Sequence, residues 1–129
     1  MERKIDIVFD STKANNEICF QIASGYISET TILFEKESVV ALIHAKGRVE
    51  FYDMKEELLA KGELPCVESG KGVYEEVCCK AEGDTIVLRF PIYEWIDNYP
   101  HCDGEHDRWD TRTIGYHTLT FDTESKTVK

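Results

Sequence analysis

Polar and apolar residues alternate along much of this chain with a period of two, which is the pattern of β-strands that bury one face. In the segment 17–23, for example, Ile18, Phe20 and Ile22 share one face. Alternation or short apolar runs predict strands at 5–9, 17–23, 28–35, 39–45, 49–52, 73–81, 85–95, 111–122 and 125–128. With short polar connections between most of them, these strands predict a mainly antiparallel sheet.

Two of the predicted strands indicate their own place in a sheet. The segment 39–45 is apolar on both faces, which is typical of a central or doubly covered strand. Pro91 lies within 85–95 and has no N–H to donate, so we expect a sheet edge or a β-bulge near it.

One segment departs from the strand pattern and predicts a short helix over 54–61. Asp53 suits the N-cap position and Glu56 the third position after it, which is a capping-box arrangement. Leu58 and Leu59 supply part of an apolar face, and Gly62 suits the position just past the last turn. The expected fold is therefore α+β, a mainly antiparallel and sandwich-like β-sheet with one short helix, in a single domain over 1–129.

Net charge narrows the choice of partner. The chain has 25 acidic and 15 basic side chains and a net charge of −10. Nucleic acid and anionic membranes are disfavoured as partners because both are negatively charged, whereas a basic protein would be attracted. High solubility alone also explains an acidic composition. The first residues lack the apolar stretch of a signal peptide and no apolar run reaches transmembrane length, so we expect a cytoplasmic protein.

The five cysteines form no CxxC pair. Cys78 and Cys79 are adjacent on a predicted strand, so their side chains point to opposite faces and cannot share one compact metal site. For a cytosolic protein with an odd number of cysteines, reduced and partly buried thiols are the expectation.

The segment 93–110 concentrates aromatic and acidic side chains. Tyr and Trp are the residue types that most often anchor protein interfaces, and carboxylates beside them suit a partner rich in Lys and Arg. Burial of the two tryptophans in the core is the competing interpretation. The predicted partner-binding residues are Tyr93, Trp95, Asp97, Tyr99, Asp103, Glu105, Asp107, Trp109 and Asp110.

The same segment contains possible metal ligands and a possible nucleophile, His101, Cys102 and His106. The spacing does not match structural zinc, which takes four ligands, commonly as two close pairs. An acidic surrounding also raises the pKa of a thiol, which disfavours a reactive thiolate. We therefore expect no catalytic residue, no metal and no cofactor here.

The small acidic chain with the segment YEWIDNYPHCDGEHDRW resembles the bacterial immunity proteins that neutralise cognate toxins, often basic nucleases. The resemblance implies an inhibitor without activity of its own whose acidic groups cover the toxin's active site. Two other functions stay open from the sequence. One is a small metal-dependent or Cys–His enzyme that uses the 101–107 loop, and the other is a β-sandwich module that binds a small ligand or sugar on aromatic rings.

Overall fold

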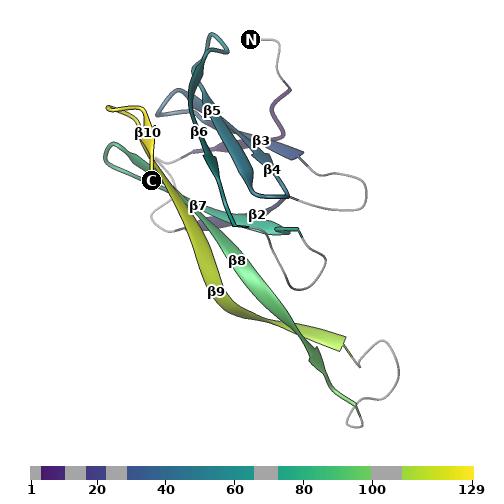
Figure 1. Ribbon diagram of the computed structural model, residues 1–129. Helices are drawn as coiled ribbons and strands as arrows, with labels where there is room; N and C mark the ends of the chain where they lie inside the picture. Colours follow the sequence, from purple (N-terminus) through teal and green to yellow (C-terminus); the bar gives the residue numbers. More distant parts are fainter. Residues whose placement is uncertain (1–3, 11–16, 23–28, 66–72, 100–108) are drawn as a thin grey trace.

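The protein is an all-β sandwich of two five-stranded sheets in a computed structural model (Figure 1). The structure describes residues 4–10, 17–22, 29–65, 73–99 and 109–129, with the side chain of Trp109 left out. The strands are β1 (Ile7–Phe9), β2 (Ile18–Gln21), β3 (Glu29–Phe34), β4 (Val39–His44), β5 (Arg48–Tyr52), β6 (Leu58–Glu63), β7 (Glu76–Glu82), β8 (Thr85–Asp97), β9 (Trp109–Asp122) and β10 (Thr127–Val128).

The first sheet has the order β1-β3-β4-β5-β6 and the second has the order β10-β9-β8-β7-β2. The chain changes sheet after β1, after β2 and after β6, so each sheet is mainly a meander of consecutive antiparallel strands. The pairing of β1 with β3 is parallel, and the other pairings are antiparallel. The prediction of a mainly antiparallel sheet is confirmed.

The core lies between the sheets and is built from every second side chain of the strands, as the alternation predicts. Phe51 on β5 and Phe121 on β9 stack with ring centroids 4.4 Å apart and join the two sheets at the centre. Phe9 and Phe34 extend the ring contacts within the first sheet. The largest fully buried side chains are Tyr74, Phe9, Phe34, Phe51, Phe90, Phe121, Ile22, Ile32, Ile43, Ile86, Leu88 and Val40.

Both predictions about strand position are confirmed. β4 is the third of five strands in its sheet, and both its faces are largely buried. A β-bulge interrupts the β8–β9 ladder between Ile92 and Tyr93, next to Pro91. On the other side of β8 the ladder with β7 ends at the Cys78–Arg89 pair, two residues before the proline, which has no N–H with which to continue it.

The predicted α+β class and its helix over 54–61 are wrong, because no helix occurs in the described parts of the chain. Asp53 still uses its carboxylate as a cap: Oδ1 accepts the backbone N–H groups of Lys55 and Glu57. Those bonds close a hairpin turn, in which Asp53 and Glu57 also pair through their backbones and Glu56 has a φ of 66°. The same short-range bonds serve a helix start and a turn equally well, and sheet pairing decided between them.

Gly62 does not end a helix, as was predicted, but allows two strands to approach each other closely. It lies on β6, where a Cβ would come within 2.9 Å of Val128 Cγ1 and 3.3 Å of the Leu119 methyl groups. The absence of a side chain lets the edge of the first sheet approach β9 and β10 of the second sheet.

The expectation of reduced cysteines is also wrong. Cys19 on β2 and Cys78 on β7 form a disulfide between directly opposite residues. Cys79 points to the other face, as predicted, and is a free thiol buried in the core. The pairing was missed because β2 and β7 are 59 residues apart in sequence and nothing local shows that they are neighbours.

No helix in the described residues is long and apolar enough to cross a membrane.

Candidate functional site

The β8–β9 hairpin extends well beyond the sandwich (Figure 1). β8 and β9 pair from Thr85 with Asp122 to Asp97 with Trp109, whereas β7 pairs with β8 only as far as Arg89. Past the bulge, β8 and β9 form a two-stranded ribbon. We call this ribbon, together with the two residues that follow β8, the arm (residues 93–99 and 109–113). A two-stranded ribbon is only marginally stable by itself in water, so the arm depends on the sandwich at its base.

Three of the predicted binding residues lie on one face of the arm. Tyr93, Trp95 and Asp97 alternate along β8, so their side chains share a face. Trp95 is 46% exposed, and Tyr99, just past the strand end, is 68% exposed. These two rings are therefore not in the core, so the alternative interpretation that Trp95 is a core residue is wrong.

Tyr93 is the half-buried member of this set and is fixed at the base of the arm. Its hydroxyl donates a 2.8 Å hydrogen bond to Oε2 of Glu76 on β7. Desolvation and this hydrogen bond to a carboxylate raise the pKa of the Tyr93 hydroxyl to about 12. Tyr93 therefore stays neutral across the physiological range and orients the strand that carries Trp95.

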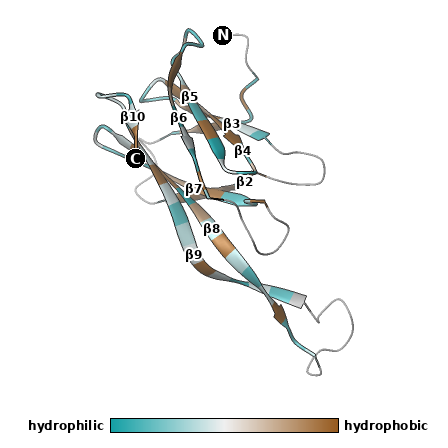
Figure 2. Cartoon of the chain, in the orientation of Figure 1, coloured by the Kyte–Doolittle hydropathy of each residue, from teal (hydrophilic) through white to brown (hydrophobic). Residues whose placement is uncertain are grey.

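The charges of the arm are divided between its two faces. Glu94 forms an ion pair with Arg112, its partner across the ladder, so this pair contributes little net charge. Asp110 pairs in register with Ile96, on the face opposite Tyr93 and Trp95. Along the outer half of the hairpin, mostly hydrophilic positions surround isolated hydrophobic ones (Figure 2). The structure thus separates Asp110 from the aromatic face with which the sequence analysis grouped it.

Several predicted residues lie outside the described part of the chain. These are the partner-binding residues Asp103, Glu105 and Asp107 and the alternative metal ligands His101, Cys102 and His106. The backbone of Trp109 is described and pairs with Asp97.

A second cluster, which the sequence analysis missed, lies at the base of the arm on the same outer face of the second sheet. The Arg89 guanidinium carbon is 3.9 Å from the centroid of the Tyr116 ring, and its Nη1 is 3.3 Å from Oε1 of Glu17. β2, β8 and β9 are thereby tied together outside the core. Glu17 is 72 residues from Arg89, so no local pattern could have predicted this contact.

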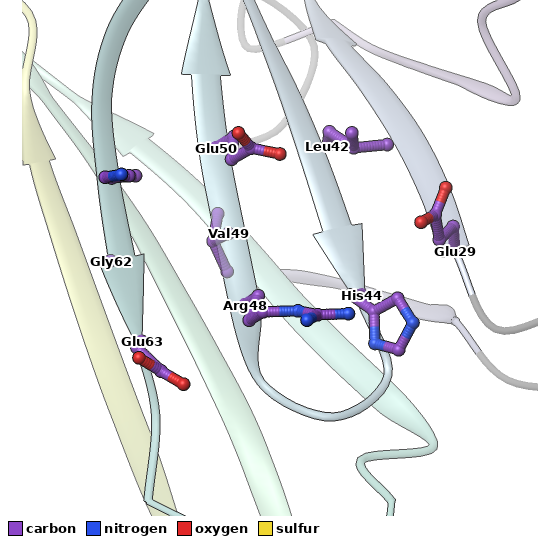
Figure 3. Close-up of a pocket in the computed structure, with 9 residues that line it drawn as sticks. Glu29, Leu42, His44, Arg48, Val49, Glu50, Gly62 and Glu63 are labelled. Carbon is purple, nitrogen blue, oxygen red and sulfur yellow. The ribbon is translucent and has the colours of Figure 1, made fainter.

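A shallow depression of about 560 Å³ lies on the outer face of the first sheet (Figure 3). Figure 3 shows Arg48 and His44 pointing toward one another across the turn between β4 and β5. The lining residues are Glu29, Leu42, His44, Arg48, Val49, Glu50, Lys61, Gly62 and Glu63.

The chemistry of the depression is that of a solvated sheet surface. Residues of opposite charge lie in register across the β5–β6 ladder, Arg48 with Glu63 and Glu50 with Lys61. Such cross-strand pairs stabilise a sheet without any ligand. The lining contains no Phe, Tyr or Trp, so the ligand-binding module with aromatic platforms predicted as an alternative has no platform here.

The two described histidines have structural contacts. His44 ends β4 half-buried, and its Nδ1 accepts the backbone N–H of Lys46. His117 Nδ1 lies 2.6 Å from the hydroxyl of Tyr74, which also donates to the carbonyl of Pro65. Cys79, the free cysteine among the described residues, is a poor nucleophile, because it is in the core and burial raises the pKa of its thiol.

The arm is therefore the best candidate for a functional surface, since it brings exposed aromatic rings together beyond the sandwich. Comparisons with family models, curated proteins and solved structures found no match for this chain.

Proposed function

We propose that this chain is a binding protein that recognises a cationic protein through the aromatic face of its arm. The observation that supports the proposal is the exposure of Trp95 and Tyr99 on a ribbon that extends beyond the core. Exposed indole and phenol rings gain most of their binding energy when a partner covers them, and Trp and Tyr are enriched among interface hot spots.

Charge supports a basic partner. The net charge of −10 attracts cations over a long range, and Asp97 shares the face of Trp95. Rings would supply the contact area, and carboxylates would raise the association rate and orient the encounter. Neutralising a cognate basic toxin, such as a nuclease, is the particular role that we propose for such a binder.

The first test uses the purified chain and the protein encoded by the gene next to its own. We expect a 1:1 complex whose association rate falls steeply between 50 mM and 500 mM salt, because screening weakens attraction between exposed charges. If that protein is a nuclease, one equivalent of this chain should abolish its activity. A complex that forms equally fast at both salt concentrations would contradict the electrostatic part of the proposal.

The second test locates the contact. Trp95→Ala should weaken the complex by about 2 kcal/mol or more, which is the hot-spot range. Leu58→Ala is the matched control, because Leu58 is 48% exposed but lies on β6, away from the arm. Equal losses from the two variants would remove the arm from the interface.

A further inference from the structure

The Cys19–Cys78 disulfide lies beside two carboxylates, those of Glu17 and Glu76. One ligand atom each from Glu17, Cys19 and Cys78 lies within 4.8 Å of the others. A fourth donor adjoins them, since Oε1 of Glu76 is 3.7 Å from Cys78 Sγ. The two sulfurs and the Glu17 carboxylate therefore lie close together on the outer face of the second sheet, and the Glu76 carboxylate adjoins Cys78.

Strand geometry explains why these four side chains converge. Cys19 and Cys78 are directly opposite in the antiparallel β2–β7 ladder. Glu17 is two residues before Cys19, and Glu76 is two residues before Cys78, so period two places each carboxylate on the same face as its cysteine. Because the strands are antiparallel, the carboxylates flank the sulfur pair on opposite sides.

The geometry points to a zinc-type site that forms when the disulfide is reduced, with Cys19, Cys78, Glu17 and Glu76 as ligands. A tetrahedral ion with metal–sulfur bonds of about 2.3 Å separates two sulfurs by about 3.8 Å and a sulfur from a carboxylate oxygen by about 3.5 Å. The Cys78–Glu76 separation of 3.7 Å already fits. Breaking the sulfur–sulfur bond lets the two sulfurs move apart by side-chain rotation, and the Glu76 side chain must also turn toward Cys19 and Glu17, because it adjoins only Cys78 in this structure.

A dithiol can reduce the Cys19–Cys78 disulfide by thiol–disulfide exchange. Two electrons and two protons pass from the dithiol to Cys19 and Cys78, and the dithiol becomes a disulfide. Binding of a divalent cation then releases the two thiol protons to solvent, because the thiolate is the metal ligand. Two thiolates select a soft or borderline cation, and two carboxylates favour Zn²⁺ over Cu⁺.

Both carboxylates accept hydrogen bonds from neighbouring side chains, as the carboxylate ligands of metal ions usually do. Arg89 contacts Oε1 of Glu17, and the Tyr93 hydroxyl donates to Oε2 of Glu76. Such outer contacts orient ligands and reduce the cost of ordering them. Cys79 does not compete for the ion, because it lies in the core on the opposite side of β7.

The test uses the Cys66→Ser/Cys102→Ser chain, in which the described cysteines are the only thiols. Co²⁺ serves as the probe, because thiolate ligands give it an intense charge-transfer band. We expect one Co²⁺ per chain after reduction by a dithiol and removal of the reductant, none before reduction, and displacement of Co²⁺ by Zn²⁺. Circular dichroism should show the same β-sheet signal in the oxidised and reduced states.

Single substitutions distinguish a defined metal site from non-specific binding of Co²⁺ by free thiols. Cys19→Ser should abolish the band, and Glu17→Gln should weaken Co²⁺ binding about tenfold or more. Glu50→Gln on the other sheet is the matched control and should change nothing. Four results would overturn the site: no binding by the reduced chain, an unchanged band in Cys19→Ser, loss of the sheet on reduction, or a disulfide that resists the dithiol in the folded protein. None of these measurements involves a protein partner, so they are independent of the proposed binding function.

Discussion

The outer faces of the two sheets are built from the same kind of alternating strand but present different surfaces. On the first sheet, residues of opposite charge alternate across the β5–β6 ladder, with Arg48 in register with Glu63 and Glu50 in register with Lys61. On the second sheet, the outer face runs into the arm, where Trp95 and Tyr99 are exposed. A face on which the two signs of charge are interspersed offers a partner no uniform field, whereas exposed rings beyond the sandwich gain by being covered.

The sandwich and the arm are also stabilised by different interactions. The sandwich is stabilised by rings and aliphatic side chains packed between two sheets. Beyond Arg89, the described part of the hairpin has two strands and is anchored by side-chain contacts such as Tyr93 with Glu76. Substitutions in the sandwich should therefore act on stability, and substitutions on the arm should act on binding.

The largest effect is expected at the centre of the sandwich. Phe51→Ala removes a ring that stacks on Phe121 of the opposite sheet, and it should lower the free energy of unfolding by about 3–5 kcal/mol. Chemical denaturation followed by circular dichroism measures this loss. A loss below about 1 kcal/mol would mean that the sheets do not depend on this contact.

The next effect concerns the approach of the two sheets. Gly62→Ala places a methyl group against Val128 and Leu119 and should cost about 1–3 kcal/mol of unfolding free energy. Gly115→Ala is the matched control, because a Cβ at Gly115 has no neighbour within 4 Å among the described residues, and its effect should stay within about 0.5 kcal/mol. The two melting temperatures test the difference directly.

A smaller effect is expected at the base of the arm. Tyr93→Phe removes the hydrogen bond to Glu76 and should cost about 1 kcal/mol at pH 8. The pKa of Tyr93 is raised from its ordinary value of 10 to about 12, so its stabilisation is complete below pH 10 and is lost as the pH rises through 12. The difference between wild type and Tyr93→Phe in denaturation should therefore shrink between pH 10 and pH 12. A difference that stays constant across this range would show that the hydroxyl does not titrate as stated.

The smallest effect on stability is expected at the exposed ring. Trp95→Ala should change the free energy of unfolding by less than about 0.5 kcal/mol, because the side chain is 46% exposed on the arm. The same substitution should have a large effect on the proposed complex. Since the chain has two tryptophans, Trp109→Phe leaves Trp95 as the only indole, and its emission should shift to the blue when a partner covers it. A large loss of stability in Trp95→Ala would place the ring in the fold instead of on its surface.

Much of the candidate site could be predicted from the sequence. The alternation of residues 85–95 placed Tyr93 and Trp95 on one strand, and Pro91 indicated the bulge that precedes the arm. The contact between Glu17 and Arg89 at the base of the arm could not be predicted, because these residues are 72 positions apart in sequence. The strand predicted over 111–122 starts earlier than expected, since β9 already begins at Trp109.

The sequence by itself determined most of the strands, because a period of two is a local property that each segment carries whatever its neighbours are. It did not determine β6, which lies where a helix was predicted. It also determined the centre of the first sheet, since a strand that is apolar on both sides must be covered on both. Tertiary structure alone decided that the segment after Asp53 forms a hairpin, that β2 pairs with β7 through Cys19 and Cys78, and that Trp95 lies outside the core. These outcomes depend on which distant strands meet, and that choice is set by the free energy of packing the two sheets as a whole.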